Sequence, residues 1–265
     1  MPDPILTVAT LNLLNDLTHW PERAPLIVNE FRAVRPDLIA LQEVSLPLNN
    51  AQWLADQLGG YSVYLSPKTG RKSKREALAI LSRMPVEDHT TLPLIDQDRV
   101  AQRVVVRHHG EPWTFANTHL YWNPFNDVAR RRQAGRILEW IAHDRPAIVC
   151  GDFNAEPHYP SITTMRRRFA SAHVEAHGRE PDYTCPTPLH RGPEPNHSAR
   201  RAALRLVGLV VRRRNVIWRG TIDYIFVDRR VRVQHCAIAF DTPAPHNQLI
   251  YPSDHLGLTA TLEMT

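Results

Sequence analysis

The chain has 265 residues, 43% of them hydrophobic and 22% charged, and this ordinary globular composition excludes a mainly disordered protein. Thirty-two lysines and arginines against 27 aspartates and glutamates give a formal net charge of +5, which is compatible with a polyanionic partner but does not identify one. The length is typical of one large two-sheet unit, and we expect residues 1–265 to form a single domain.

Membrane-spanning and disulfide-stapled proteins are also excluded. The longest uncharged apolar run is far shorter than a membrane span. The first residues, Met1 to Pro4, lack the basic start and apolar middle of a signal peptide. The three cysteines (Cys150, Cys185 and Cys236) cannot form a fully paired framework and lack zinc-finger spacing. We therefore expect a reducing, cytoplasmic location.

Apolar runs and turn residues predict strands and helices in the first half of the chain. Apolar residues at helical spacing predict a helix over Pro21–Val34 that Pro36 stops, and a shorter one around Trp53–Leu58 that ends at Gly59. Residues 109–112 fit a hairpin turn. The predicted strands, mostly apolar runs, are Ile5–Leu11, Leu38–Leu41, Tyr61–Leu65, Ala77–Ser82, Arg103–Arg107 and Trp113–Leu120.

The second half continues the alternation. A long helix is expected over Asp127–His143, with Ile137, Leu138 and Ile141 on its buried face and its arginines opposite. Further predicted strands are Ala147–Cys150, Ile222–Val227, Val231–Phe240 and Leu256–Leu262. Strands and helices that alternate without internal repeats predict an α/β (α+β) layered fold, with sheets inside and helices outside.

Residues 177–219 interrupt this alternation. The segment holds five prolines in its first part and, from residue 200 onward, seven arginines. We interpret it as a long, Pro- and Arg-rich surface insertion within the domain, because no second core is visible in it. Inside it, Ala199–Val211 fits either a short amphipathic helix or an apolar hairpin arm.

Polar side chains stand where the predicted apolar strands begin or end. They are Asn12, Glu43, His119, Asp152, Asn154, Asp223, Asp254 and His255. If the strands lie side by side, these residues converge on one rim of the fold. Crowded carboxylates repel one another, so such a cluster implies a divalent cation or protonation. Carboxylate and amide oxygens favour Mg²⁺, with Mn²⁺ as the alternative.

The order of these residues along the chain resembles the endonuclease/exonuclease/phosphatase superfamily. The matching strings are Thr10-Leu11-Asn12, Leu41-Gln42-Glu43-Val44, Ala79-Ile80-Leu81-Ser82-Arg83, Asn117-Thr118-His119-Leu120, Gly151-Asp152-Phe153-Asn154, Ile222-Asp223-Tyr224-Ile225 and Ser253-Asp254-His255. The superfamily includes pancreatic-type deoxyribonucleases, abasic-site endonucleases, inositol phosphatases, neutral sphingomyelinases and carbon-catabolite-type deadenylases. The resemblance implies a single-domain, DNase I-like fold: a four-layer α/β sandwich of two mixed β-sheets flanked by helices.

The resemblance also implies roles in metal-dependent hydrolysis of a phosphoester bond. Glu43 would be the main Mg²⁺ ligand, with Asn12 and Asp254 near it. Asp152 would position and deprotonate the attacking water, and Asn154 would hold water or a phosphoryl oxygen. His255, oriented by Asp223, would stabilise charge on the phosphoryl group, and His119 would donate a further hydrogen bond. The number of metals stays open.

Two segments are candidate substrate contacts. The string His119-Leu120-Tyr121-Trp122-Asn123 looks most like the deadenylase branch, where Tyr121 and Trp122 could stack on a base beside Asn123. Trp122 packing under the loop is an equally good interpretation. Residues 68–75 form a predicted phosphate-contact loop, with Lys72, Lys74 and Arg75 as its predicted contacts. Its five cations are Lys68, Arg71, Lys72, Lys74 and Arg75. The basic segment Arg130–Gln133 could also lie near a phosphate, but it is at least as well interpreted as a solvated face of the following helix.

Three functions are considered. The leading hypothesis is a nuclease or phosphodiesterase acting on nucleic acid or a nucleotide-like phosphorylated small molecule. A phosphodiesterase or phosphatase for phospholipid or inositol phosphate is the second, with membrane contact at Leu204–Val211 less favoured than packing on the sandwich. A non-catalytic nucleic-acid-binding module is the third, and the intact polar set argues against it. Substrate, endo or exo action and oligomeric state stay open.

Overall fold

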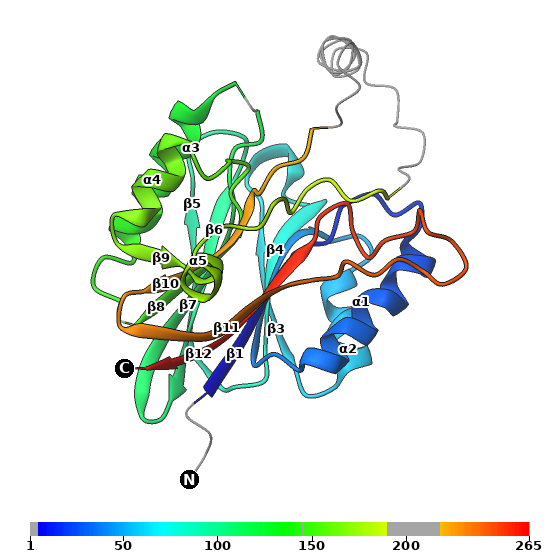
Figure 1. Ribbon diagram of the computed structural model, residues 1–265, viewed down its shortest axis with the longest axis horizontal. Coiled ribbons are helices and arrows are strands. Elements are labelled where there is room, and N and C mark those ends of the chain that lie inside the picture. Colours follow the sequence, from blue (N-terminus) through cyan, green and yellow to red (C-terminus); the bar gives the residue numbers. More distant parts are fainter. Residues whose placement is uncertain (1–4, 124, 145, 190–217, 265) are drawn as a thin grey trace.

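Two six-stranded β-sheets face each other in the computed structural model, which describes residues 5–123, 125–144, 146–189 and 218–264 (Figure 1). The first sheet has the strand order β11 (Val231–Ala239), β12 (Gly257–Met264), β1 (Ile5–Asn12), β2 (Leu38–Ser45), β4 (Glu76–Ser82) and β3 (Ser62–Pro67). The second has the order β5 (Val86–Pro93), β6 (Val100–His108), β7 (Glu111–His119), β8 (Ala147–Asp152), β10 (Asp223–Asp228) and β9 (Phe169–Ser171). Both are mixed sheets, because β1 runs parallel to β2 and β7 parallel to β8.

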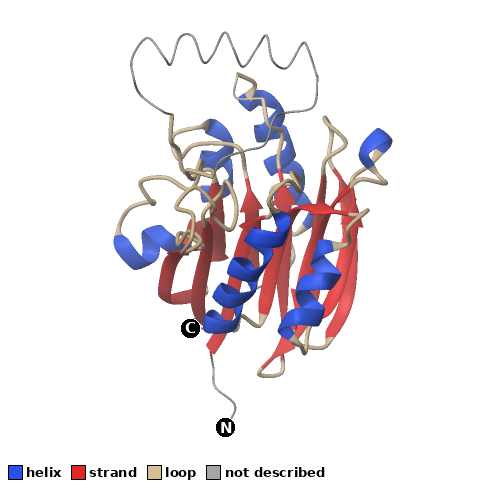
Figure 2. Ribbon diagram, turned by 90° about the vertical axis from the view of Figure 1, so that its right-hand side faces the viewer, coloured by secondary structure: helices blue, strands red, loops and turns tan. Residues whose placement is uncertain are grey.

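Helices cover the outer faces of both sheets, so the molecule has four layers (Figure 2). The helices α1 (Trp20–Val34) and α2 (Asn50–Leu58) pack on the first sheet through residues such as Phe31 and Leu54. The helices α3 (Asp127–Trp140) and α4 (Pro160–Arg166) pack on the second. A third apolar cluster fills the space between the sheets. The predicted four-layer α/β sandwich is confirmed.

Several elements were not predicted. The strand β5 has a polar, partly exposed sequence without apolar alternation, because it lies at the edge of its sheet. The short elements α4, β9, α5 (Ala172–His177) and the 3₁₀ turn η1 (Gly70–Lys72) carry too few apolar residues for a periodic signal. The long predicted helix ends at Trp140 rather than His143.

The expectation that the arginines of α3 face solvent is wrong for Arg130. This side chain is fully buried beside Ile137 and Ala134 on the packed face of the helix. Its guanidinium bonds to Asp127 at 3.0 Å and to the carbonyl of Asn123 at 2.6 Å. A buried arginine is tolerated here because its donors are satisfied. Arg130 therefore holds the loop after β7 rather than a solvated surface.

The predicted insertion at 177–219 is only partly described. Residues 178–189 are irregular, as expected, but the expectation of a surface segment is wrong for their second half, since Thr184, Cys185, Thr187 and Leu189 are buried. Residues 190–217, including the Ala199–Val211 helix or hairpin arm and Leu204–Val211, lie outside the described residues. Among the described residues, no helix is long and apolar enough to cross a membrane.

Candidate active site

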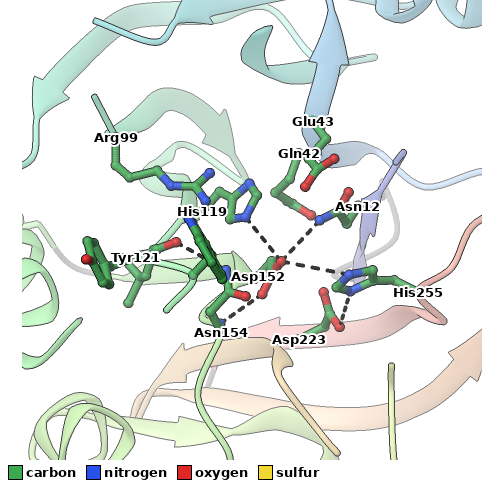
Figure 3. A network of polar contacts seen from close by, with 12 residues as sticks. Asn12, Gln42, Glu43, Arg99, His119, Tyr121, Asp152, Asn154, Asp223 and His255 are labelled. Atoms are coloured by element: carbon green, nitrogen blue, oxygen red, sulfur yellow. Dashed lines mark hydrogen bonds and ion pairs between the residues drawn. The ribbon is translucent and has the colours of Figure 1, made fainter. Parts of the chain in front are cut away.

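The topology brings the predicted polar residues to one end of the sandwich (Figure 3). Asn12 ends β1 beside Gln42, its register partner in β2. In the facing sheet, Asp152 ends β8 and pairs in register with His119 of β7 and with Asp223 of β10. Parallel neighbours end at the same edge and antiparallel neighbours begin there, so these strand ends meet.

Asp152 is the centre of the cluster. Its Oδ2 accepts a hydrogen bond from Asn12 Nδ2 at 3.1 Å and lies 3.3 Å from His119 Nε2. His255 Nε2 lies 4.0 Å from the same oxygen, and Oδ1 accepts from the backbone N–H of Asn154 at 2.8 Å. Burial, followed by repulsion from Asp223, raises the pKa of Asp152 to about 7. The carboxyl group is therefore poised to take up a proton near neutral pH.

The two histidines differ in charge because their neighbours differ. Burial works against the imidazolium of His255, but Asp223, whose Oδ2 lies 2.9 Å from His255 Nδ1, outweighs it and the pKa rises well above its usual value. Thr184 Oγ1 donates to the same Asp223 oxygen at 2.6 Å and fixes its position. For His119, burial and the nearby cations Arg99 and Lys68 hold the pKa well below the usual range. One imidazole is thus cationic and the other neutral.

Glu43 occupies an interruption of β2. The pairing of β2 with β4 shifts register between Leu41 and Val44, and Glu43 itself has φ 55°, a value uncommon outside glycine. Its Oε2 accepts from the backbone N–H of Asn15 at 2.9 Å. A bulge of this kind turns a side chain out of the strand's regular alternation, and here it presents the carboxylate on the same side as Asn12 (Figure 3).

A buried polar network lies under the site and joins the sheets. Gln42 Nε2 donates to Asn117 Oδ1 at 2.8 Å, and Asn117 Nδ2 donates to the carbonyls of Leu41 and Ala79, each at 2.9 Å. Gly151 lets β7 and β8 approach closely here, since a Cβ on it would lie 2.0 Å from the Thr118 carbonyl oxygen. These contacts fix the register that aligns the polar strand ends.

The oxygen donors fit a hard divalent cation. Glu43 has no ion-pair partner among the described residues, and its neighbour Asn12 adds an amide oxygen. Carboxylate and amide oxygens are suited to Mg²⁺ or Mn²⁺. The described residues also contain two buried groups that could hold a metal ion, Asp152 with Asp223 and His255, and Cys185 with Asp254 and His255. The predicted ligand Asp254 thus groups with His255.

Two buried cations face the site from the other side. Lys68 and Arg99 are both buried and share the carboxylate of Glu76, to which Arg99 Nη1 lies 3.7 Å away. Arg99 Nε and Nη1 have no hydrogen-bond partner among the described residues, and the guanidinium points toward His119 (Figure 3). Arg99 was not predicted, because nothing in the sequence around it distinguishes it from a surface arginine.

The predicted phosphate-contact residues occupy more outward positions. Lys72 is 60% exposed and lies 3.6 Å from Glu76, while Lys74 and Arg75 are exposed. Lys72 acts electrostatically on His119, but more weakly than Arg99 and Lys68 do. The inner position is therefore held by Lys68, the first cation of the predicted loop, and by Arg99, which was not predicted. The role of the outer three cations stays a prediction.

The loop after β7 carries the predicted stacking residues. Tyr121 turns its ring away from Asp152 (Figure 3), and its backbone N–H donates to Gln133 Oε1 at 2.8 Å. Trp122 is 44% exposed as a residue, so it does not pack under the loop. The carbonyl of Asn123 accepts the Arg130 bond. Among its described residues, the loop therefore has two exposed aromatic side chains, Trp122 and Phe125 (83% exposed), while Tyr121 is half-buried.

A buried arginine, Arg23, joins a segment near the start of the chain to one near its end, behind the site. Arg23 of α1 donates to the carbonyls of Pro252 at 2.9 Å and of Asp16 at 2.8 Å, and also to the carbonyl of Leu13. Asn12 precedes one of these anchored segments and Asp254 follows another. Burial lowers the pKa of Arg23 to about 10, which leaves the guanidinium charged. Arg23 therefore positions the loops that carry Asn12 and His255.

This fold and this arrangement of strand-end residues define a class of protein. The sequence profile of the Endonuclease/Exonuclease/phosphatase family matches residues 9–255, and the chain belongs to that family.

The individual relatives share about a third of their aligned residues or fewer with this chain. Protein angel homolog 2 of Mus musculus is 30% identical over 170 residues, which cover 56% of this chain and 31% of the relative. Nocturnin of Rattus norvegicus is 28% identical over 264 residues, which cover 90% of this chain and 58% of the relative. The chain spans only part of the length of both relatives.

Solved structures share the fold. The human nocturnin catalytic domain with bound sulfate superposes with a TM-score of 0.72 at 22% identity, covering 99% of this chain and 95% of that one. Danio rerio TDP2 complexed with a single-strand DNA product gives a TM-score of 0.78 at 18% identity, covering 99% and 100%. A Bacteroides thetaiotaomicron mannosyl-6-phosphatase gives 0.74 at 20% identity, covering 97% and 99%.

Proposed function

We propose that the chain is a metal-dependent phosphoric ester hydrolase that cleaves a phosphodiester bond of nucleic acid or of a nucleotide-like substrate. One observation carries the proposal: a buried carboxyl group, Asp152, surrounded by Asn12, a neutral His119 and a cationic His255. Family membership supports phosphoester hydrolysis. The fold shared with TDP2, whose solved structure holds a single-strand DNA product, supports nucleic acid as the substrate class.

The site residues suit in-line attack by water. Asp152 would orient the water and accept its proton, at a pKa suited to general-base catalysis near neutral pH. His255, held by Asp223, would place positive charge on the phosphoryl group, and His119 would donate a further hydrogen bond to it. Asn154 bonds to the Leu120 carbonyl through Nδ2 at 3.1 Å, which leaves its side-chain oxygen for a water molecule.

Glu43 and Asn12 would hold Mg²⁺ or Mn²⁺, which when bound offsets charge on the phosphoryl oxygens and the leaving group. Lys68 and Arg99 would contact a phosphate of the substrate through charge-assisted hydrogen bonds. Trp122 would offer a stacking surface for a base. The cytoplasmic location expected from the sequence stays a prediction.

The test is a substrate panel with and without Mg²⁺ or Mn²⁺, run on the native chain and on Asp152→Asn. The panel holds abasic and nicked duplex DNA, poly(A) RNA, cyclic-phosphate RNA ends, nucleotides, sphingomyelin and inositol phosphates. Loss of a general base costs about 10²- to 10⁴-fold, so Asp152→Asn is expected to lower kcat by that amount while the chain stays folded. Asp88→Asn, the same change on an exposed carboxylate of β5, is the matched control.

Three outcomes decide the proposal. Metal-dependent cleavage of a nucleic-acid or nucleotide substrate that Asp152→Asn abolishes supports it. Cleavage of sphingomyelin or inositol phosphates alone rejects nucleic acid as the substrate and supports a phospholipid or inositol-phosphate hydrolase instead. Asp152→Asn with the native rate, or no hydrolysis of any substrate in the presence of either metal, rejects the assignment.

A further inference from the structure

A cysteine lies against the cationic histidine of the site, and the proposed mechanism does not use it. Cys185 is buried, and its sulfur lies within 4.8 Å of a ring nitrogen of His255. The Asp254 carboxylate completes a set of three, whose ligand atoms all lie within 4.8 Å of one another. Each side chain is less than a tenth exposed, at 6% for Cys185, 3% for Asp254 and 7% for His255.

Backbone hydrogen bonds fix these three residues relative to one another. Cys185 forms a two-residue antiparallel bridge with Gly220, through bonds of 3.1 and 2.8 Å. The N–H of Thr187 donates to the Asp254 carbonyl at 2.8 Å, and the N–H of Leu256 donates to the Thr184 carbonyl at 2.7 Å. The segment around Cys185 is therefore attached directly to the segment that carries Asp254 and His255.

The donor types differ from those near Glu43. A thiolate sulfur, an imidazole nitrogen and a carboxylate oxygen are the ligands of zinc sites, and a thiolate selects soft or borderline metals over Mg²⁺. Zinc bonds of about 2.0 to 2.3 Å bring ligand atoms to roughly 3.5 Å from one another in a tetrahedral site. A fourth position would remain for water, as in sites with three protein ligands.

We propose that Cys185, Asp254 and His255 form a binding site for Zn²⁺ or a similar thiophilic divalent cation, separate from the oxygen ligands Glu43 and Asn12. Binding would release the thiol proton of Cys185 and a proton of His255 to solvent. If the proposed function holds, the bound cation also removes His255 from the phosphoryl group, so the site inhibits hydrolysis. Mg²⁺ would serve the reaction, and a softer metal would stop it.

The test that does not depend on catalysis is Co²⁺ titration of the full chain in saturating Mg²⁺, followed by absorption spectroscopy. Mg²⁺ keeps Co²⁺ from the oxygen ligands near Glu43. A Co²⁺ ion bound by Cys185 shows a thiolate-to-metal charge-transfer band, which an ion held by oxygen alone lacks. The band is expected in the native chain and in Cys236→Ser, which alters a buried cysteine of the core, and is expected to be absent from Cys185→Ser.

Zinc inhibition supplies the second measurement. The native chain and Cys185→Ser are each compared with their own rate without Zn²⁺. Loss of an outer-shell partner already weakens metal sites about 10- to 100-fold, so the inhibition constant of Cys185→Ser is expected to rise at least about tenfold.

A native chain without the charge-transfer band overturns the proposal, and so does a band that persists in Cys185→Ser. Equal inhibition of the two chains places zinc at the oxygen ligands and also overturns it. If no substrate is cleaved at all, the spectrum still decides the metal site, so its failure and that of the proposed function are distinguishable. Thermal unfolding of Cys185→Ser by circular dichroism establishes that the variant is folded.

Discussion

Replacement of Arg99 by methionine should separate activity from stability. Arg99 is buried, two of its nitrogens have no hydrogen-bond partner among the described residues, and its nearest carboxylate, Glu76, also serves Lys68 and Lys72. Burial lowers the pKa of Arg99, because removal from water disfavours the charged guanidinium. We expect its missing partner to be a phosphate of the substrate.

The expected magnitudes follow from these contacts. A charge-assisted hydrogen bond to a phosphate contributes about 1.5 to 3 kcal/mol, so Arg99→Met should lower kcat/KM roughly 10- to 150-fold. Replacement of a poorly compensated buried charge by a methionine of similar length should leave the free energy of unfolding unchanged or raise it, by up to about 4 kcal/mol. Glu76 keeps two cations in the variant, so it is not left unpaired.

The assay is metal-dependent hydrolysis of the substrate that the panel identifies, with urea unfolding in parallel. Arg107→Met is the matched control, because Arg107 lies at the opposite end of β6 and pairs with exposed Glu87 at 2.8 Å. It should change neither quantity by more than about 0.5 kcal/mol. An Arg99→Met chain that hydrolyses at the native rate, or that loses more than about 1 kcal/mol of stability, would refute the reasoning.

Two further predictions concern the scaffold. Gly151→Ala should lower the free energy of unfolding by about 3 kcal/mol or more, because its Cβ would meet the Thr118 carbonyl oxygen at 2.0 Å and its φ is +140°. Gly135→Ala in α3, where nothing lies within 4 Å of the new Cβ, should raise it by about 0.5 to 1 kcal/mol. Thermal unfolding measures both, and equal shifts would contradict the close approach of β7 and β8. Burial lowers the pKa of Lys68 from 10.5 to about 8. Between these values the unfolded chain keeps a proton that the folded chain has released, so stability should rise with pH, by up to about 3 kcal/mol. Urea unfolding across this window should show the rise in the native chain and not in Lys68→Met, and parallel profiles would count against the burial of Lys68.

The sequence predicts the layered fold well because buried strands are continuous apolar runs. The strand over Ala147–Cys150 and the residues that follow it illustrate this, since an apolar run that stops at Asp152 marks both a strand and its end. The order of the polar residues then predicts one converging rim. This part of the site depends on local sequence and on the rule that neighbouring strand ends meet.

The rest of the site depends on contacts that have no local signal. Arg99 resembles any surface arginine in sequence, and only the packing of its loop against Glu76 buries it. Thr184 and Cys185 lie in a proline-rich stretch typical of surface loops, yet backbone bonds to Gly220 and Leu256 draw them inside. The buried Arg130 has a similar origin, because the Asn123 carbonyl to which it donates belongs to a loop that the helix pattern does not include.

The pairing of the first and last strands sets the time at which the site can form. In the first sheet β12 lies between β11 and β1, and Ser253 Oγ donates to the Asn12 carbonyl at 2.6 Å. During synthesis, Asn12 and Glu43 leave the ribosome long before His255 does. A nascent chain that has emerged only as far as β11 has an open first sheet and no imidazolium beside Asp152. The complete set of polar strand-end side chains therefore forms only after residues 253–264 have joined the first sheet.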